Sequence, residues 1–169
     1  MKKFTRIIGI AFLAVSVLSC SDDNESPPTI VDIASSNAED VFKYRKITNN
    51  AFTNNEKLEF RVHYGLINAA SIVFEVGPAL VQKYDRKCFN VKAEGKTLKS
   101  FDWAYKVRDR FETYIDAEAM APISYNKSVQ EDKYTDNDLV TFKHNTKKLF
   151  GVKGMLDMPV YTHDVISSI

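Results

Sequence analysis

The chain is poor in the residues that commonly build metal sites and reactive centres. Its 169 residues include two cysteines, three histidines and six glycines. The histidines are scattered, and no His-x-x-x-His or Cys-x-x-Cys spacing brings potential metal ligands together. Neither a phosphate-binding glycine loop nor a Gly-x-Ser-x-Gly motif occurs. We therefore expect no metal, no cofactor and no catalytic residue, and the composition favours a protein without enzymatic activity.

The chain also lacks an apolar run long enough to cross a membrane. Its longest such run covers residues 7–18 and contains Gly9 and Ser16, whereas a spanning helix needs about 20 apolar residues. A basic start followed by a short apolar run is typical of a secretory signal. Cys20 follows Leu18-Ser19 directly, which is the arrangement that precedes lipidation of a bacterial lipoprotein. The sequence thus predicts a lipoprotein signal peptide over residues 1–19 and lipidation at Cys20.

Polar residues dominate the stretch after Cys20. The tract 21–25 reads Ser-Asp-Asp-Asn-Glu, and Ser, Asp, Asn and Pro remain frequent to about residue 50. Such a composition disfavours packing, so residues 20–50 are predicted to form a flexible tether. We expect an outer-membrane protein held by a lipid anchor, with both the periplasmic face and the cell surface open as its location.

Neither positive nor negative charge is in large excess. The net charge of +1 includes Lys2, Lys3 and Arg6, so the chain without residues 1–19 carries 1 − 3 = −2. Nucleic-acid binding is not expected, because it needs a basic stripe. If Cys20 is lipidated, Cys88 has no disulfide partner within the chain, and we expect it to be buried and structural.

Alternating apolar and polar residues fill most of the remaining chain. In 57–64, Leu58, Phe60, Val62 and Tyr64 share one face, and a similar alternation over 69–76 makes a hairpin with it. Further strands are predicted over 87–93, 101–116, 123–133, 139–143 and 148–153, with a turn at 135–138. Residues 159–166 are predicted to begin a short C-terminal helix capped by Thr162 or Asp164. The predicted fold is mainly β: an antiparallel meander sheet or a partly open barrel, over residues 51–169.

Several separated blocks carry a family resemblance. They are Ala51-Phe52, residues 56–69, Phe101-Asp102-Trp103, residues 107–110, and Pro159 with residues 164–168. In this order they resemble the bacterial domain of unknown function 3108 family. The resemblance implies an envelope protein of antiparallel strands and carries no activity or site residue with it. It also implies a shortened member whose domain is incomplete at its C-terminal end, because relatives continue past 164–168 through a fuller helix and more strands.

The candidate site residues follow from the expected strand over 101–116. Asp109 falls on its aromatic face, where an unpaired carboxylate is costly. We expect a structural carboxylate paired with an arginine such as Arg61, Arg108 or Arg110, a position where the face opens to water or a strand bulge turns it outward, or a ligand or acid/base role. The residues that we expect to face a ligand are Trp103, Tyr105, Asp109, Phe111, Arg61 and His63. The leading hypothesis is a non-catalytic binding or assembly module for a lipid, glycan or protein of the envelope. Two alternatives remain: an envelope hydrolase using an acidic residue such as Asp109 with Arg61 or His63, and a truncated member without function.

Overall fold

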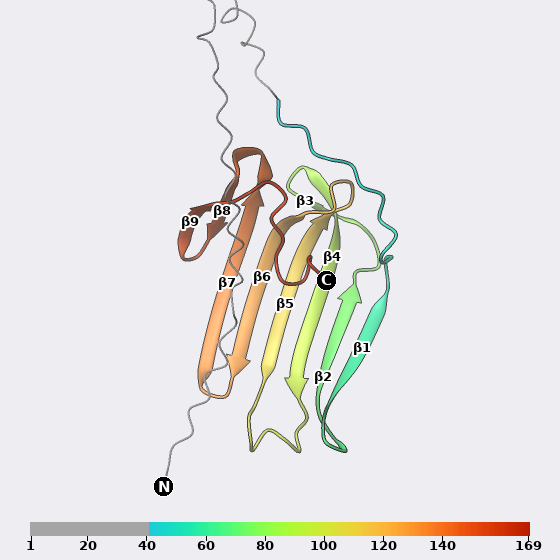
Figure 1. Cartoon of the computed structure of the whole chain (residues 1–169), viewed down its shortest axis with the longest axis vertical. Coiled ribbons are helices and arrows are strands. Elements are labelled where there is room, and N and C mark those ends of the chain that lie inside the picture. The colour runs from blue at the N-terminus through green and yellow to red at the C-terminus, as the bar shows by residue number, and fades with distance from the viewer. Residues whose placement is uncertain (1–40) are drawn as a thin grey trace, which may run out of the picture. The chain divides into compact units, whose positions relative to one another are not determined.

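The computed structural model describes residues 41–169, which contain one antiparallel sheet of nine strands (Figure 1). The strand order is β1-β2-β4-β5-β6-β7-β8-β9, with the short β3 paired beside β4. Each strand therefore follows its neighbour in a meander, and the sheet does not close into a barrel. This confirms the predicted mainly β fold in its meander form. The signal peptide, Cys20 and the tether up to residue 40 lie outside the described residues.

The first hairpin forms where the alternation is cleanest. β1 (Lys57–Tyr64) and β2 (Ile67–Val76) pair antiparallel, with Phe60 opposite Ile72 and Leu58 opposite Phe74. Gly65 has a φ of 61° in the turn, a conformation that glycine adopts at little cost. The apolar residues of both strands lie on one face of the sheet, as predicted.

The centre of the sheet consists of β3 (Val81–Lys83), β4 (Arg86–Thr97), β5 (Arg108–Asp116) and β6 (Pro122–Glu131). Across β4, β5 and β6, Val91 lies opposite Thr113, and Thr113 lies opposite Tyr125. The remaining strands are β7 (Tyr134–Lys143), β8 (Lys148–Gly151) and β9 (Gly154–Asp157), with a single 3₁₀ turn, η2 (His144–Thr146), before β8. Strands β3 and β9 were not predicted because each is too short to show an alternation.

Several predicted strand boundaries are wrong: β4 continues to Thr97 instead of ending at residue 93, β8 ends at Gly151, and the two largest errors concern β5 and β7. Residues 101–104 do not belong to the β5 strand but form consecutive turns, in which Phe101 N–H donates to Leu98 O at 2.8 Å and Ala104 N–H to Phe101 O at 2.9 Å. The turn expected at 135–138 is instead part of β7. The chain instead reverses at residues 132–133, between β6 and β7, where Asp132 has a left-handed φ of 47°.

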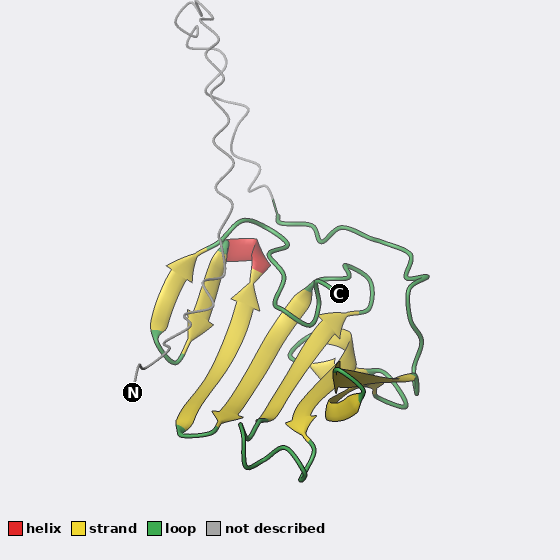
Figure 2. Ribbon diagram, turned by 60° about the horizontal axis from the view of Figure 1, so that its bottom comes forward, coloured by secondary structure: helices red, strands yellow, loops and turns green. Residues whose placement is uncertain are grey.

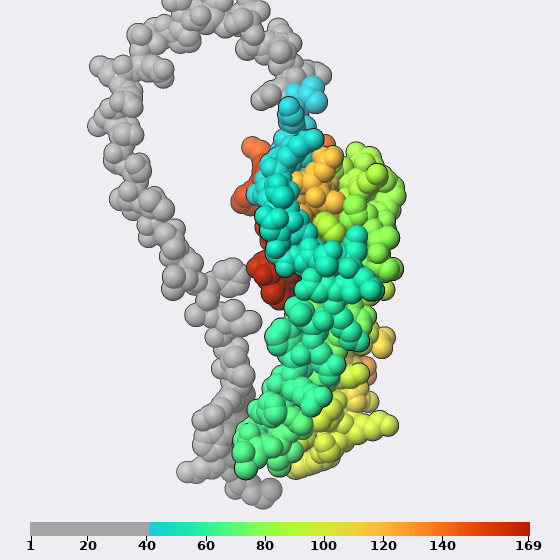
Figure 3. Space-filling model, turned by 90° about the vertical axis from the view of Figure 1, so that its right-hand side faces the viewer, coloured from blue at the N-terminus to red at the C-terminus, as the bar shows by residue number. Residues whose placement is uncertain are grey.

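The sheet has an inner and an outer face (Figure 2). The inner face carries the apolar residues of β1 and β2 together with Val91, Ile115 and Tyr125, and the core cluster forms on it. The outer face carries mostly charged side chains, including Lys92, Glu112, Glu94 and Arg110 in two ion pairs. The C-terminal residues lie on the inner side, above the end of the β1–β2 hairpin, which curves toward the same side (Figure 3).

The C-terminal segment 158–169 covers part of the inner face. It contains turns but no helix, so the expected helix at 159–166 does not form. Met158 and Ile166 are buried within the core cluster. Residues 41–50 have no regular secondary structure and contact the domain through Ile47 N–H, which donates to Glu118 O at 2.8 Å. Among residues 41–169, no helix is long and apolar enough to cross a membrane.

Candidate ligand-binding cavity

A cavity of ≈ 440 Å³ lies between the inner face of the sheet and the C-terminal segment. Its floor consists of apolar side chains from β1, β2, β4 and β5. These are Leu58, Phe60, Phe74, Val76, Val91 and Ile115. Residues 166–169 and His163 line the other side, and Phe52 and Met120 line one end. The polar groups, among them Glu56 and Ser168, come from the loops and termini, so the floor itself offers no hydrogen-bonding side chain.

Asp164 fixes the C-terminal segment to the sheet. Its Oδ2 accepts a hydrogen bond from Thr113 Oγ1 at 2.8 Å, and Thr113 is fully buried in the middle of β5. Its Oδ1 accepts from the backbone N–H groups of Ile166 at 2.8 Å and Ser167 at 3.0 Å. One carboxylate thus closes the local turn and holds it against the sheet, which places Ile166 over the cavity.

A second buried contact holds the start of this segment. Tyr161 N–H donates to His144 Nδ1 at 3.2 Å, so the ring proton is on Nε2, which donates to Pro122 O at 2.8 Å. Burial lowers the pKa of His144. The neutral imidazole therefore links β6, η2 and the C-terminal segment, and a charged one would lose the Tyr161 bond.

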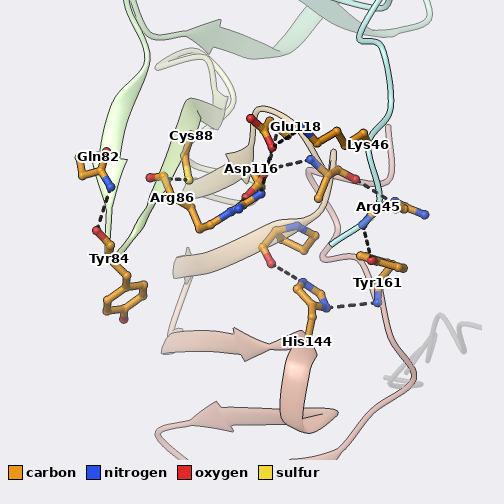
Figure 4. A network of polar contacts seen from close by, with 12 residues as sticks. Arg45, Lys46, Gln82, Tyr84, Arg86, Cys88, Asp116, Glu118, His144 and Tyr161 are labelled. Atoms are coloured by element: carbon orange, nitrogen blue, oxygen red, sulfur yellow. Dashed lines mark hydrogen bonds and ion pairs between the residues drawn. The ribbon is translucent and has the colours of Figure 1, made fainter. Parts of the chain in front are cut away.

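The β5–β6 turn carries the main polar cluster (Figure 4). Arg86 forms an ion pair with the buried Asp116, whose Oδ1 accepts from Ala119 N–H at 2.7 Å and Glu118 N–H at 2.8 Å. Burial by itself would raise the pKa of Asp116. The hydrogen bonds from Arg86 and from the two backbone N–H groups outweigh burial, so the pKa of Asp116 is lowered. Arg45 donates to Ala119 O at 2.9 Å. Every charged group here has a partner, so we assign the cluster to stability.

Charged residues occupy the inner face beyond the apolar floor. Lys127, on β6, lies opposite Phe111 of β5. The Lys127 Nζ is 2.6 Å from Asp136 Oδ2 on β7. Lys153 approaches the same carboxylate at 3.5 Å. The hydrogen bond from Lys127 lowers the pKa of Asp136. The inner face is therefore apolar over β1, β2 and β4, whereas over β6 and β7 it carries both core residues such as Tyr125 and Val140 and the charged Lys127 and Asp136.

Two of the predicted ligand-facing aromatic residues lie elsewhere. Trp103 is 84% exposed within the turns that follow β4, and Tyr105 is 50% exposed, with its hydroxyl donating to Glu131 at 3.0 Å. Neither lines the cavity. The alternation that placed them on one face is not maintained, because the chain is not extended before Val107.

Asp109 and Phe111 do lie on the inner face. Phe111 packs against the core and stacks on Tyr125 at 6.3 Å between ring centroids. Asp109 lies opposite Gly95, and its Oδ1 accepts from Gln130 N–H at 3.0 Å. Partial burial, with a contribution from Glu131, raises the pKa of Asp109. Asp109 thus has a hydrogen-bond partner within the sheet, which was one of the alternatives that the sequence left open, and it is not among the cavity residues.

Arg61 and His63 are on β1, exposed, and apart from Asp109. Arg61 lies opposite Ser71 and so shares the outer face, while Asp109 is on the inner face of β5, three strands away along the sheet. Antiparallel neighbours are about 4.8 Å apart. The structure therefore does not assemble the carboxylate, arginine and histidine that a hydrolase was suggested to use.

Cys88 is fully buried, and burial raises its pKa to about 12, so it is not an activated thiol. No cluster of potential metal ligands occurs within residues 41–169. Neither Asp164, which holds the C-terminal segment, nor the cavity residue Ile166 was predicted as a site residue. Asp164 was expected only as a possible helix cap, and both residues belonged to a family block. Their role depends on the contact with Thr113, 51 residues earlier, which no local pattern reveals.

The described residues thus form a mainly β protein: an open antiparallel sheet with an apolar cavity under its C-terminal segment. A family model described as "Protein of unknown function (DUF3108)" matches residues 59–165, which is more than half of the chain. The chain belongs to this family. The searches of curated proteins and of solved structures give no match.

Proposed function

We propose that this protein binds the acyl chain of a lipid in the cavity between the inner face and the C-terminal segment, without chemistry of its own. The observation that carries the proposal is the ≈ 440 Å³ cavity with its apolar floor. Small-molecule sites commonly occupy about 300–1,000 Å³ and are mainly apolar, with a few polar groups at their edge. The lining matches both criteria.

The lining also distinguishes two of the expected ligand classes, a lipid and a glycan. A glycan needs several hydrogen-bonding side chains along its length, and the floor residues Val76, Val91 and Ile115 supply none. An acyl chain needs only apolar surface, and each buried methylene contributes about 0.8 kcal/mol. The cavity therefore favours a lipid over a glycan. The hydrolase alternative is not favoured, because its proposed residues lie on different faces.

The proposed location follows from the sequence. Residues 1–19 have the features of a lipoprotein signal and Cys20 those of the lipidated residue. We place the protein at the outer membrane, held by this anchor, on the periplasmic face or the cell surface. A lipid ligand agrees with such a location, since the anchor would hold the cavity beside a membrane.

A matched pair of substitutions tests the proposal. Val76 lines the cavity and Val73, on the same strand, faces the opposite side of the sheet. We would titrate the full chain with cis-parinaric acid, a fluorescent fatty acid, and compare Val76→Phe with Val73→Phe. If the phenyl group displaces about two methylenes, binding weakens by about 1.6 kcal/mol, or roughly 15-fold, for Val76→Phe.

Val73→Phe is expected to bind as the unchanged chain does, and circular dichroism checks that both variants fold. Absence of probe binding to the unchanged chain, or equal weakening by both variants, contradicts the proposal. The second alternative, a truncated protein without function, predicts the first of these results together with a broad, non-cooperative thermal transition.

A further inference from the structure

Strand β1 ends the sheet and leaves one long edge exposed. It pairs only with β2, and all eight of its residues are exposed. Val76 N–H donates to Glu56 O at 2.8 Å. Because backbone groups alternate in direction along an antiparallel strand, those of Leu58 and Phe60 also face β2, and those of Glu59 and Arg61 face away. The outward groups form a row that another strand can pair with.

The side chains of this edge also leave apolar surface exposed and charges without an ion pair. On the inner face, Leu58, Phe60 and Val62 are 49%, 51% and 42% exposed. On the outer face Lys57 pairs with Glu75 at 2.7 Å. Glu59 and Arg61 form no ion pair with any residue in the described range 41–169. The edge thus presents apolar side chains on one face and two unpaired charges of opposite sign on the other.

We propose that β1 pairs antiparallel with β1 of a second copy of this chain, with a two-fold axis at Phe60. In this register Phe60 lies opposite the partner's Phe60, and Leu58 lies opposite the partner's Val62. Glu59 lies opposite the partner's Arg61, and the symmetry repeats this ion pair. Opposite charges and aromatic residues that face each other across strands are both stabilising.

Other registers are less complementary. A two-fold axis at Arg61 places Arg61 opposite itself, and an axis at Glu59 places two carboxylates together; both arrangements are destabilising. A shift of one residue puts the apolar side chains of one copy opposite the charged side chains of the other. An axis at Leu58 places Lys57 opposite Glu59, but Lys57 already pairs with Glu75 and only residues 57–59 of β1 remain paired. An axis at Val62 also shortens the paired stretch and loses the Glu59–Arg61 pairs. The charge pattern of β1 therefore selects the register centred on Phe60.

Cross-linking tests the register directly in cells that express the full chain. Residues opposite each other at a non-hydrogen-bonded position have Cα atoms about 4.5 Å apart, within the roughly 4.4–6.8 Å span of a disulfide. With diamide as the oxidant, Phe60→Cys is expected to give a disulfide-linked dimer on a non-reducing gel. Glu59→Cys and Arg61→Cys are the matched controls. Each introduced thiol has its twin at a diagonal position, about 7–8 Å away, so we expect little dimer.

Stronger cross-linking of Arg61→Cys than of Phe60→Cys, or no cross-linked dimer with any of the three, overturns the proposal. The unchanged chain measures the background from Cys20 and Cys88. The latter is buried.

A charge reversal provides the second test. Glu59→Arg or Arg61→Glu alone places like charges opposite each other twice in the dimer and is expected to weaken association by about tenfold or more. The double variant Glu59→Arg/Arg61→Glu restores both pairs and is expected to restore the dimer. The control Glu94→Arg/Arg110→Glu exchanges an ion pair within one copy, away from the edge. Sedimentation velocity of the full chain in mild detergent measures the dimer fraction.

If the double variant remains as weak as the single ones, the register is refuted. This result is independent of the acyl-chain proposal, because the Glu59 and Arg61 side chains are on the outer face and do not line the cavity.

Discussion

Replacing Asp164 should release the C-terminal segment from the sheet. Asp164→Ala removes the hydrogen bond from Thr113 Oγ1 at 2.8 Å and those from the backbone N–H groups of Ile166 and Ser167. A hydrogen bond to a charged group contributes about 1.5–3 kcal/mol, and an orphaned buried hydroxyl costs about 1–3 kcal/mol. Thr113 keeps a longer bond to Ser124 O at 3.3 Å, which reduces the second cost. We expect a loss of about 2–4 kcal/mol in the free energy of unfolding.

Urea unfolding followed by circular dichroism measures this loss. Asp157→Ala is the matched control, because Asp157 also accepts a short hydrogen bond, from Lys148 at 2.6 Å, but its side chain is 87% exposed. An exposed ion pair contributes about 0–1 kcal/mol. If the two variants lose the same stability to within about 0.5 kcal/mol, Asp164 does not hold the C-terminal segment as described.

Three further predictions concern the polar groups around the core. Burial lowers the pKa of His144, so the unfolded chain takes up a proton first, and stability should fall as pH drops below about 6.5. His144→Gln should flatten this dependence in urea titrations at several pH values, and a pH dependence that this variant leaves unchanged would contradict the role given to His144. Arg86→Ala leaves Asp116 buried and unpaired and should cost about 3 kcal/mol or more by thermal unfolding; a loss equal to that of the exposed Lys57→Ala would contradict this assignment. Cys88, buried and with its pKa raised to about 12, should resist iodoacetamide until the protein unfolds, and rapid labelling in the native state, located by mass spectrometry, would show that its burial is wrong.

The sequence patterns predicted the sheet well where neighbouring residues decide the structure. The β1–β2 hairpin follows from alternation and from Gly65, both of which act within a few residues. The strand predicted before Val107 is wrong for a different reason, because two local structures compete there. Its alternation of Phe101, Trp103 and Tyr105 is compatible with a strand, but the backbone satisfies its hydrogen bonds locally, with Tyr105 N–H donating to Phe101 O at 3.2 Å.

Long-range partners explain the remaining differences. Asp136 and Asp138 are typical turn residues, yet both lie in β7, where Asp136 pairs with Lys127 and Asp138 accepts from Val152 N–H at 3.1 Å. Asp164 was predicted to cap a helix. It does cap a local turn, through Ile166 and Ser167, but the contact that matters for the cavity is with Thr113, and nothing near Asp164 in the sequence indicates it.

The residues that the sequence predicted to face a ligand are not the ones that line the cavity. The sequence pattern placed the aromatic residues around Trp103 on one face of a strand and predicted that this face meets a ligand. An apolar face exists, but its cavity is formed by Phe60, Phe74 and Val91 with the C-terminal segment. A sequence pattern identifies which residues share a face. It does not show which part of the face a distant segment covers, and that covering creates the cavity.

The most direct test of the central claim is to map where an acyl chain binds. The full chain would be irradiated with a fatty acid that carries a diazirine near its methyl end, and the labelled residues would be located by mass spectrometry. Labels on the cavity residues, such as Phe74, Val91 and Ile166, that decrease when unlabelled fatty acid competes, are the predicted result. Labels confined to the outer face, or labelling that competitor does not reduce, would contradict the account.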